Sequence, residues 1–235
     1  MRTIPLRFAV VLAVATLTAS SQATAQTTPP SLLSDVEVRQ LIARGEPGDH
    51  ERLSDHFTIL AQRYEADARR HESMGRAFSG NQKLAAAATS LREHCRQLSA
   101  RNLESAATLR ELVAHHTKLA TGQPSDPPNS AERFERGAGA PAPSDETLMR
   151  LAGEAETTSD HRALEDYFTS LAARYEQDTK RSTAFAASWR VSGSKNPSAS
   201  GLAARWDRLA REQRASAVEA RAAAALHKQQ AATTR

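Results

Sequence analysis

Hydrophobic residues recur at alternating steps of three and four between residues 49 and 78. Three positions of this stripe are occupied by polar residues instead of hydrophobic ones. Its members are His50, Leu53, Phe57, Leu60, Tyr64, Asp67, His71, Met74 and Phe78. This period is typical of one buried face of a helix and does not fit the alternation of a strand. It therefore predicts one long helix that ends at Ser79-Gly80-Asn81.

A second helix of the same kind is predicted from about residue 83 to 120. Its stripe has the same three-four spacing, again with polar residues near its middle: Leu84, Ala88, Leu91, Cys95, Leu98, Asn102, Ser105, Leu109, Leu112, His116 and Leu119. Two such helices joined by a short break form an antiparallel hairpin. Stripes with this spacing pack at a crossing angle of about 20°.

The chain contains this plan twice. Residues 49–67, DHERLSDHFTILAQRYEAD, match residues 160–178, DHRALEDYFTSLAARYEQD, at 12 of 19 positions with an offset of 111. Further positions agree at the same offset, including His116 with His227. The repeat predicts two units, residues 34–121 and 144–231.

Each unit begins with a short helix. Ser34 to Glu37 forms a capping-box pattern, and the helix that it opens is expected to stop near Gly45. Asp49 is then the expected N-cap of the long helix. A single hairpin of this size has too little core to fold alone. We therefore expect an all-α protein in which the two hairpins form a four-helix bundle or paired hairpins, dimerisation being the other way to bury the same faces.

The N-terminus reads as a secretory signal peptide. Arg2 and Arg7 precede the apolar run 8–17, and Ala23-Thr24-Ala25 supplies a cleavage motif. The run is too short to span a bilayer, and no later segment is apolar enough to do so. We therefore expect cleavage after Ala25, a disordered lead-in over 26–33, and a periplasmic or secreted product.

The two units are joined by a predicted linker, residues 122–143. It contains five of the ten prolines of the chain together with several glycines and serines. This composition gives mixed extended and flexible character. Its length allows the units to lie side by side or apart.

Charge argues against a nucleic-acid partner. The chain has 31 basic and 27 acidic residues, and removing Arg2 and Arg7 with the signal peptide brings the net charge from +4 to +2. Such a balanced protein lacks the basic excess of nucleic-acid binders. The last helix does carry a basic stripe at seven-residue spacing, which is either a solvated face or a contact for an anionic surface. It consists of Arg214, Arg221, Lys228 and Arg235.

The first hairpin holds the candidate metal ligands. Folding it about its turn, with Phe78 facing Leu84, places the single cysteine opposite an aspartate and near two histidines and a methionine: Asp67, His71, Met74, His94 and Cys95. Sulfur and imidazole donors suit Cu(I), and without the methionine they suit Zn(II). In the second unit the last four become Ser182, Phe185, Arg205 and Trp206. The alternative is that these residues of unit 1 are core packing.

His50 and His116 are weaker candidate metal ligands at the open end of the first hairpin. They are expected to lie close together, and His161 and His227 repeat them in unit 2. Because His50 stands in the first turn of a helix, the helix dipole favours its neutral form. The alternative is that these histidines only close the ends of the bundle.

A repeated polar layer is predicted in the middle of the hairpins. Asp67 and Asp178 each follow a tyrosine by three residues and an arginine by four, and the return helices carry Asn102 and Gln213 in mid-stripe. Buried carboxylates need partners. We interpret these residues as fixing the register of the helices.

No nucleophile–base–acid arrangement, phosphate-binding glycine loop or HExxH motif occurs in the sequence. We therefore expect a non-enzymatic exported protein that acts through structural or partner contacts. The partner would be an unknown cell-envelope protein or a second copy of the chain. The alternative is a metal-binding or metal-responsive protein that uses Cu or Zn in unit 1.

Overall fold

The computed structural model describes residues 32–121, 143–192 and 199–234. The predicted signal peptide, most of the lead-in, nearly all of the linker and the turn of the second hairpin lie outside the described residues. The described part folds into α1 (Asp35–Arg44), α2 (Pro47–Gly80), α3 (Ala85–Ala120), α4 (Asp145–Glu154), α5 (Thr158–Ser192) and α6 (Ala199–Thr233). A 3₁₀ turn, Gln82–Leu84, joins α2 to α3. The all-α prediction is confirmed.

The helix α1 begins and ends where its caps predict. The Ser34 side chain accepts a hydrogen bond from the Glu37 backbone N–H, and Glu37 bonds back to Ser34 in a full capping box. Gly45 ends α1 with φ 68°, a conformation that glycine adopts at no steric cost. At the start of α4, the Ser144 side chain accepts a hydrogen bond from the N–H of Thr147.

The long helix α2 starts earlier than expected. Glu46 is its N-cap and Pro47 its first residue, so Asp49 lies at the third position instead of at the cap. The Asp49 carboxylate accepts a hydrogen bond from the Glu46 N–H and pairs with Arg44 at 2.6 Å. Proline is well suited to this first position because its missing N–H would be unpaired there anyway.

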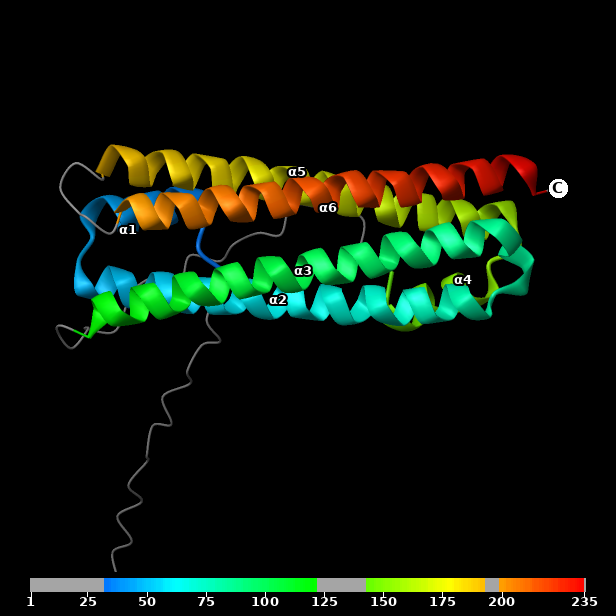
Figure 1. The fold of residues 1–235 in the computed structure, drawn as a ribbon, viewed down its shortest axis with the longest axis horizontal. Helices are drawn as coiled ribbons and strands as arrows, with labels where there is room; N and C mark the ends of the chain where they lie inside the picture. The colour runs from blue at the N-terminus through cyan, green and yellow to red at the C-terminus, as the bar shows by residue number, and fades with distance from the viewer. Residues whose placement is uncertain (1–31, 122–142, 193–198, 235) are drawn as a thin grey trace, which may run out of the picture.

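The two hairpins pack into one four-helix bundle (Figure 1). α2 packs along α3 and α5 along α6, while α3 and α6 join the hairpins. The short helices α1 and α4 each contact both α2 and α5. Figure 1 shows the turn of the first hairpin and the C-terminus of α6 at the same end of the bundle. The two units therefore run antiparallel to one another.

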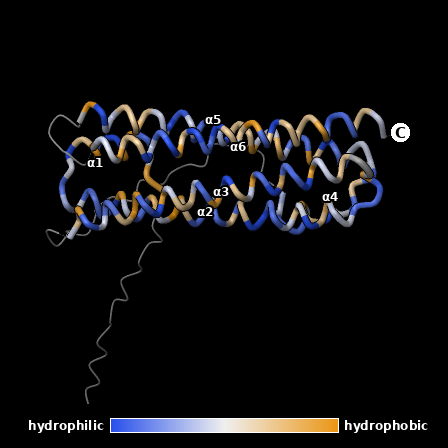
Figure 2. Tube along the Cα trace, viewed as in Figure 1, coloured by the Kyte–Doolittle hydropathy of each residue, from blue (hydrophilic) through white to orange (hydrophobic). Residues whose placement is uncertain are grey.

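One hydrophobic core runs through both units. Its members include Phe57, Met74, Phe78, Phe168 and Trp206, all nearly or fully buried. Along each long helix hydrophobic positions alternate with hydrophilic ones, as the sequence pattern predicts (Figure 2). Among the described residues, no helix combines the length and apolar character needed to cross a membrane.

Candidate functional site

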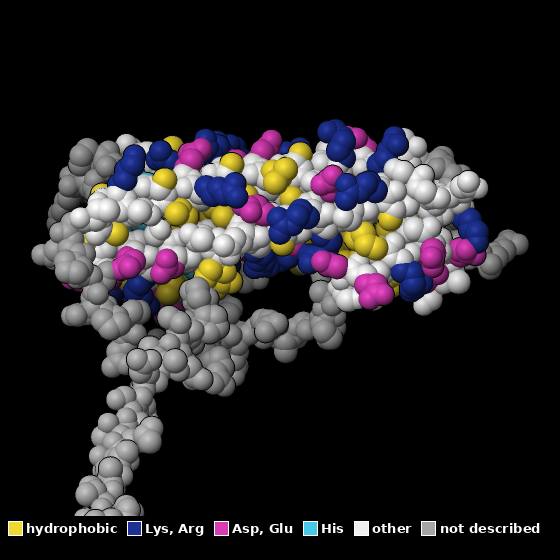
Figure 3. Space-filling view, turned by 90° about the horizontal axis from the view of Figure 1, so that it is seen from below, with side chains coloured by type: hydrophobic (Ala, Val, Ile, Leu, Met, Phe, Trp, Pro, Cys, Tyr) yellow, Lys and Arg dark blue, Asp and Glu magenta, His cyan; other side chains and the backbone are white. Residues whose placement is uncertain are grey.

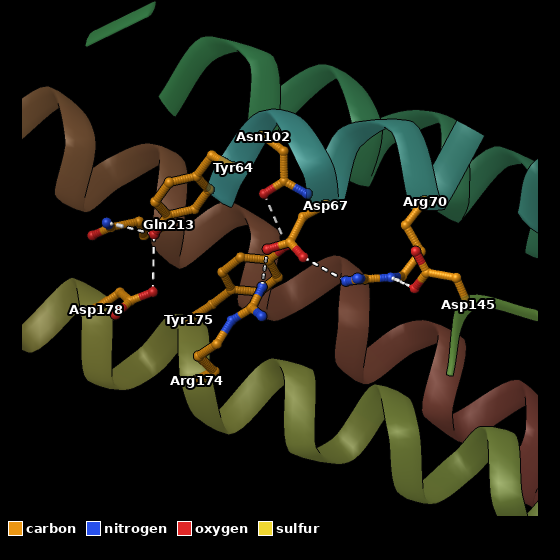
Figure 4. A network of polar contacts seen from close by, with 9 residues as sticks. All are labelled: Tyr64, Asp67, Arg70, Asn102, Asp145, Arg174, Tyr175, Asp178 and Gln213. Atoms are coloured by element: carbon orange, nitrogen blue, oxygen red, sulfur yellow. Dashed lines mark hydrogen bonds and ion pairs between the residues drawn. The ribbon is translucent and has the colours of Figure 1, made fainter. Parts of the chain in front are cut away.

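The middle of the bundle contains a layer of polar side chains that joins the two units (Figure 4). The rings of Tyr64 and Tyr175, equivalent residues of the repeat, stack with centroids 6.4 Å apart. The Tyr64 hydroxyl donates to Asp178 at 2.9 Å and accepts from the Gln213 amide at 2.9 Å. The Tyr175 hydroxyl donates to Asn102 at 2.8 Å. The predicted polar layer is thus confirmed, and each of these hydrogen bonds joins one unit to the other.

Asp67 accepts hydrogen bonds from two arginines in this layer. Arg70 donates at 2.7 Å, and Arg174 of the other unit donates from across the bundle. The Arg174 guanidinium also lies 5.0 Å from the centre of the Tyr175 ring. Burial raises the pKa of Tyr175 to about 12, so this phenol stays protonated as a hydrogen-bond donor. Each oxygen of the buried Asp67 carboxylate thus accepts a hydrogen bond from one guanidinium, so the charge of Asp67 is paired.

One ion pair joins each short helix to the long helix of the other unit. Arg70 reaches Asp145, in the first turn of α4, at 2.5 Å. Its repeat equivalent Arg181 reaches Asp35, in the first turn of α1. Sequence reasoning missed these arginines. The signal was present, because Arg70 and Arg181 stand at the repeat offset of 111 and Asp35 and Asp145 at nearly the same one.

The two predicted histidine pairs are formed at opposite ends of the bundle. Nδ1 of His50 lies 3.0 Å from Nδ1 of His116, and the corresponding distance from His161 to His227 is 3.5 Å. Each pair is covered by a ring from the turn end of the other hairpin. The His116 ring lies 5.9 Å from that of Trp189, and the His227 ring lies 5.7 Å from that of Phe78.

Burial keeps these histidines neutral. It lowers the pKa of His116 to about 3, with the neighbouring His50 and His115 as further causes. It lowers the pKa of His227 to about 3, with His161 as the second cause. For His50, in the first turns of α2, the sequence argument expected neutrality from the helix dipole. Burial is the first cause that lowers the pKa of His50. In a neutral pair, one Nδ1–H can donate to the lone pair of the other ring.

The residues of the predicted metal neighbourhood have separate partners. Asp67 belongs to the polar layer, and Met74 lies in the apolar core. Nδ1 of His94 lies 2.8 Å from a carboxylate oxygen of Glu219 on α6. Within the described ranges there is no group of three or more His, Cys, Asp or Glu side chains that could hold a metal ion. The metal site, including its His50 and His116 candidates, stays a prediction.

The predicted register of the first hairpin is wrong. Cys95 lies beside Gly75, where a Cβ atom on the glycine would stand 3.4 Å from the Cys95 Cβ, instead of opposite Asp67. The physical reason is the 3₁₀ turn, which delays the start of α3 to Ala85. Burial raises the pKa of the Cys95 thiol to about 12, so it remains protonated within the core.

His71 is buried without a hydrogen-bond partner. Neither of its ring nitrogens is paired, although the side chain is 0% exposed. Its ring stacks on Phe168 with centroids 6.4 Å apart. Burial lowers its pKa to about 3, and the neighbouring Arg174 and Arg70 act in the same direction. Since buried polar groups are normally paired, this imidazole stands out in the molecule.

An open groove runs beside His71 on the outer side of the first hairpin. It has a volume of about 600 Å³ and lies between α2 and α3. Gly75, Ala100 and Leu103 contribute apolar lining, and Leu103 is 53% exposed. Arg92 lies at the same groove. This combination of an apolar lining and an exposed guanidinium makes the groove our candidate binding site.

The surface around the helices carries both signs of charge. Figure 3 shows Lys and Arg interspersed with Asp and Glu, with small hydrophobic areas between them. In the basic stripe of α6, Arg214, Arg221 and Lys228 are exposed, and Arg221 pairs with Glu176. Arg235 lies outside the described residues. The role of the stripe as a contact for an anionic surface stays a prediction.

Comparison with known proteins identifies no related protein. No protein-family model, no curated protein and no solved structure matches the chain.

Proposed function

We propose that this chain is exported, loses residues 1–25, and acts without catalysis by contacting a partner in the cell envelope. The signal-peptide pattern supports export: Arg2 and Arg7 precede an apolar run, and Ala23-Thr24-Ala25 follows it. The mature protein would begin at Gln26 in the periplasm or outside the cell. Its partner would be another envelope component or a second copy of the chain.

The observation that carries the contact function is the groove between α2 and α3. Leu103 is 53% exposed and lines this groove together with Gly75 and Ala100. An open, largely apolar groove beside charged side chains is a common form of binding surface.

The use of the buried polar groups supports a role in contact instead of catalysis. Asp67 is occupied by two arginines, and Tyr64 and Tyr175 are bonded to Asp178 and Asn102. A catalytic carboxylate or phenol needs a face free for substrate. Here these groups hold the two hairpins together and so give the groove a rigid support.

Site-specific photo-crosslinking tests this proposal. A photoreactive residue at position 103 in the exported protein should give a discrete adduct in living cells. Val218 is the matched control, because it is 55% exposed on α6 and does not line the groove. An adduct at 103 that is absent at 218 is the expected result. No adduct at 103, or equal adducts at both positions, would refute contact through the groove.

The second candidate function is metal binding in unit 1. The observation that favours it is His71, a neutral imidazole with two unpaired nitrogens on the hairpin that also carries Met74 and Cys95. Protein taken from its native compartment would then contain about one Cu or Zn per chain, and the double variant His71→Ala/Cys95→Ser would lose it. Metal far below stoichiometry would remove this candidate.

A further inference from the structure

We propose that the groove between α2 and α3 binds an alkyl chain that carries an anionic head group. This inference deepens the proposed function and rests on it for the location of the contact surface. The head group is a carboxylate or a phosphate monoester, since the recognising chemistry is the same for both.

The apolar part of the groove matches an alkyl chain. Arg92 and Leu103 stand eleven residues apart on α3, which is about 16 Å along a helix. Between them lies the small residue Ala100, and Gly75 of α2 packs closely against Cys95 and the Arg92 carbonyl. An open groove with apolar lining along this length accepts a flexible alkyl chain. Covering the exposed face of Leu103 then removes apolar surface from water.

The charges of the groove match an anionic head group. Two of its arginines are already paired within their own helices: Arg76 with Glu72 at 2.7 Å and Arg96 with Glu93 at 2.5 Å. Arg92 is exposed and has no ion pair within the described part of the chain. Its guanidinium is therefore free to form two parallel hydrogen bonds with a carboxylate or phosphate.

His71 also belongs to the lining of the groove, but its imidazole is fully buried and packs against Tyr167 and Phe168 of α5. It therefore offers no exposed donor to the groove, and the head group depends on Arg92.

Titration calorimetry on the whole chain from Gln26 to Arg235 tests the inference. The probes are dodecanoate and dodecyl phosphate, below their micelle concentrations, with dodecan-1-ol and butyrate as comparison compounds. We expect both anionic probes to bind at one site per chain. Dodecanol, which lacks the charge, and butyrate, which lacks the chain, should each bind at least tenfold more weakly.

Matched variants locate the site. Arg92→Glu and Leu103→Asp should each weaken dodecanoate binding at least tenfold. Arg211→Glu and Val218→Asp, at exposed positions of α6 outside the groove, should leave it unchanged. All four positions are exposed, so that each variant keeps the fold, and circular dichroism verifies this for each protein.

Absence of dodecanoate binding, or equal loss in the groove and control variants, would overturn the inference. The proposed function fails separately, through the crosslinking at position 103. A polypeptide adduct at 103 together with no dodecanoate binding would show that the groove contacts a protein and would refute the amphiphile.

Discussion

At the residue scale, the most unusual property of the protein is its buried histidines. Six of the eight histidines are buried. Burial is the largest cause in lowering the pKa of each of them, to about 4 for His56 and to about 3 for His71, His116 and His227. In acid each of these histidines binds a proton in the unfolded chain, but stays neutral in the folded protein because its pKa is lower there. They are His50, His56, His71, His116, His161 and His227.

The folded protein should therefore lose stability in mild acid. Above pH 6.5 these histidines are neutral in both states and contribute no pH dependence. Between pH 6.5 and about 3 only the unfolded state takes up protons, so the free energy of unfolding falls as the pH falls. For His227 alone the loss at pH 5 is about 2 kcal/mol, at about 1.4 kcal/mol per pH unit. Urea unfolding at pH 7.5 and 5.0 measures it.

The variant His227→Gln isolates this contribution. It removes the titrating ring that faces His161, Phe78 and Phe168. Between pH 7.5 and 5.0 the free energy of unfolding of this variant should fall by about 2 kcal/mol less than that of the unchanged protein. This difference does not depend on the stability of the variant at pH 7.5. An identical loss in both proteins would show that His227 titrates normally in the folded state.

At the scale of the elements, the polar layer joins α2 to α5 through hydrogen bonds and ion pairs. The two aspartates of the repeat have unequal roles, because Asp67 holds two guanidiniums while Asp178 accepts from Tyr64 and, at 3.3 Å, from Arg181. Arg174 also differs from its equivalent Arg63, which is half-buried and has no ion pair among the described residues.

Substituting Asp67 and Asp178 should therefore have unequal effects on stability. Asp67→Asn leaves the partly buried Arg174 without its counter-charge and should cost about 3 kcal/mol of unfolding free energy. Asp178→Asn should cost about half as much, because its amide oxygen can still accept from Tyr64. Arg63→Ala, the control, should change stability by less than about 0.5 kcal/mol. Chemical denaturation ranks the three. Equal costs at 67 and 178 would mean that Arg174 contributes nothing.

The sequence predicts the elements better than their contacts. Helical periodicity and the Ser34 and Gly45 caps give the helices, because these signals are local. The register of Cys95 against Gly75 depends on the 3₁₀ turn, which periodicity does not determine. Contacts between units, such as that of His94 with Glu219, need the orientation of the two hairpins. The repeat shows which residues are equivalent but not which of them meet.

At the scale of the whole molecule, each hairpin completes the other. The turn end of the first hairpin brings Phe78 over His227, and that of the second brings Trp189 over His116. Phe57 and Trp206 meet across the units with ring centroids 5.2 Å apart. A single hairpin would expose all these rings. The bundle is therefore one cooperative unit, as the small core of each hairpin requires.

A fragment covering residues 26–121 should not fold as a monomer. Its circular dichroism should show reduced helix, or sedimentation should show that two copies pair to replace the missing hairpin. Mixing it with residues 143–235 should restore the full helical signal. A monomeric fragment that unfolds cooperatively at the same urea concentration as the whole chain would contradict the two-hairpin bundle.

The antiparallel arrangement of the two units is the central claim, and spin-label distances test it most directly. Lys83, at the turn of the first hairpin, pairs with Glu156 just before α5, whereas Val191 lies near the far end of α5. In a Cys95→Ser background, labels at 83 and 156 should give a short distance, and labels at 83 and 191 about 50 Å, the length of a 35-residue helix. The reverse order, which parallel hairpins would produce, would contradict the account.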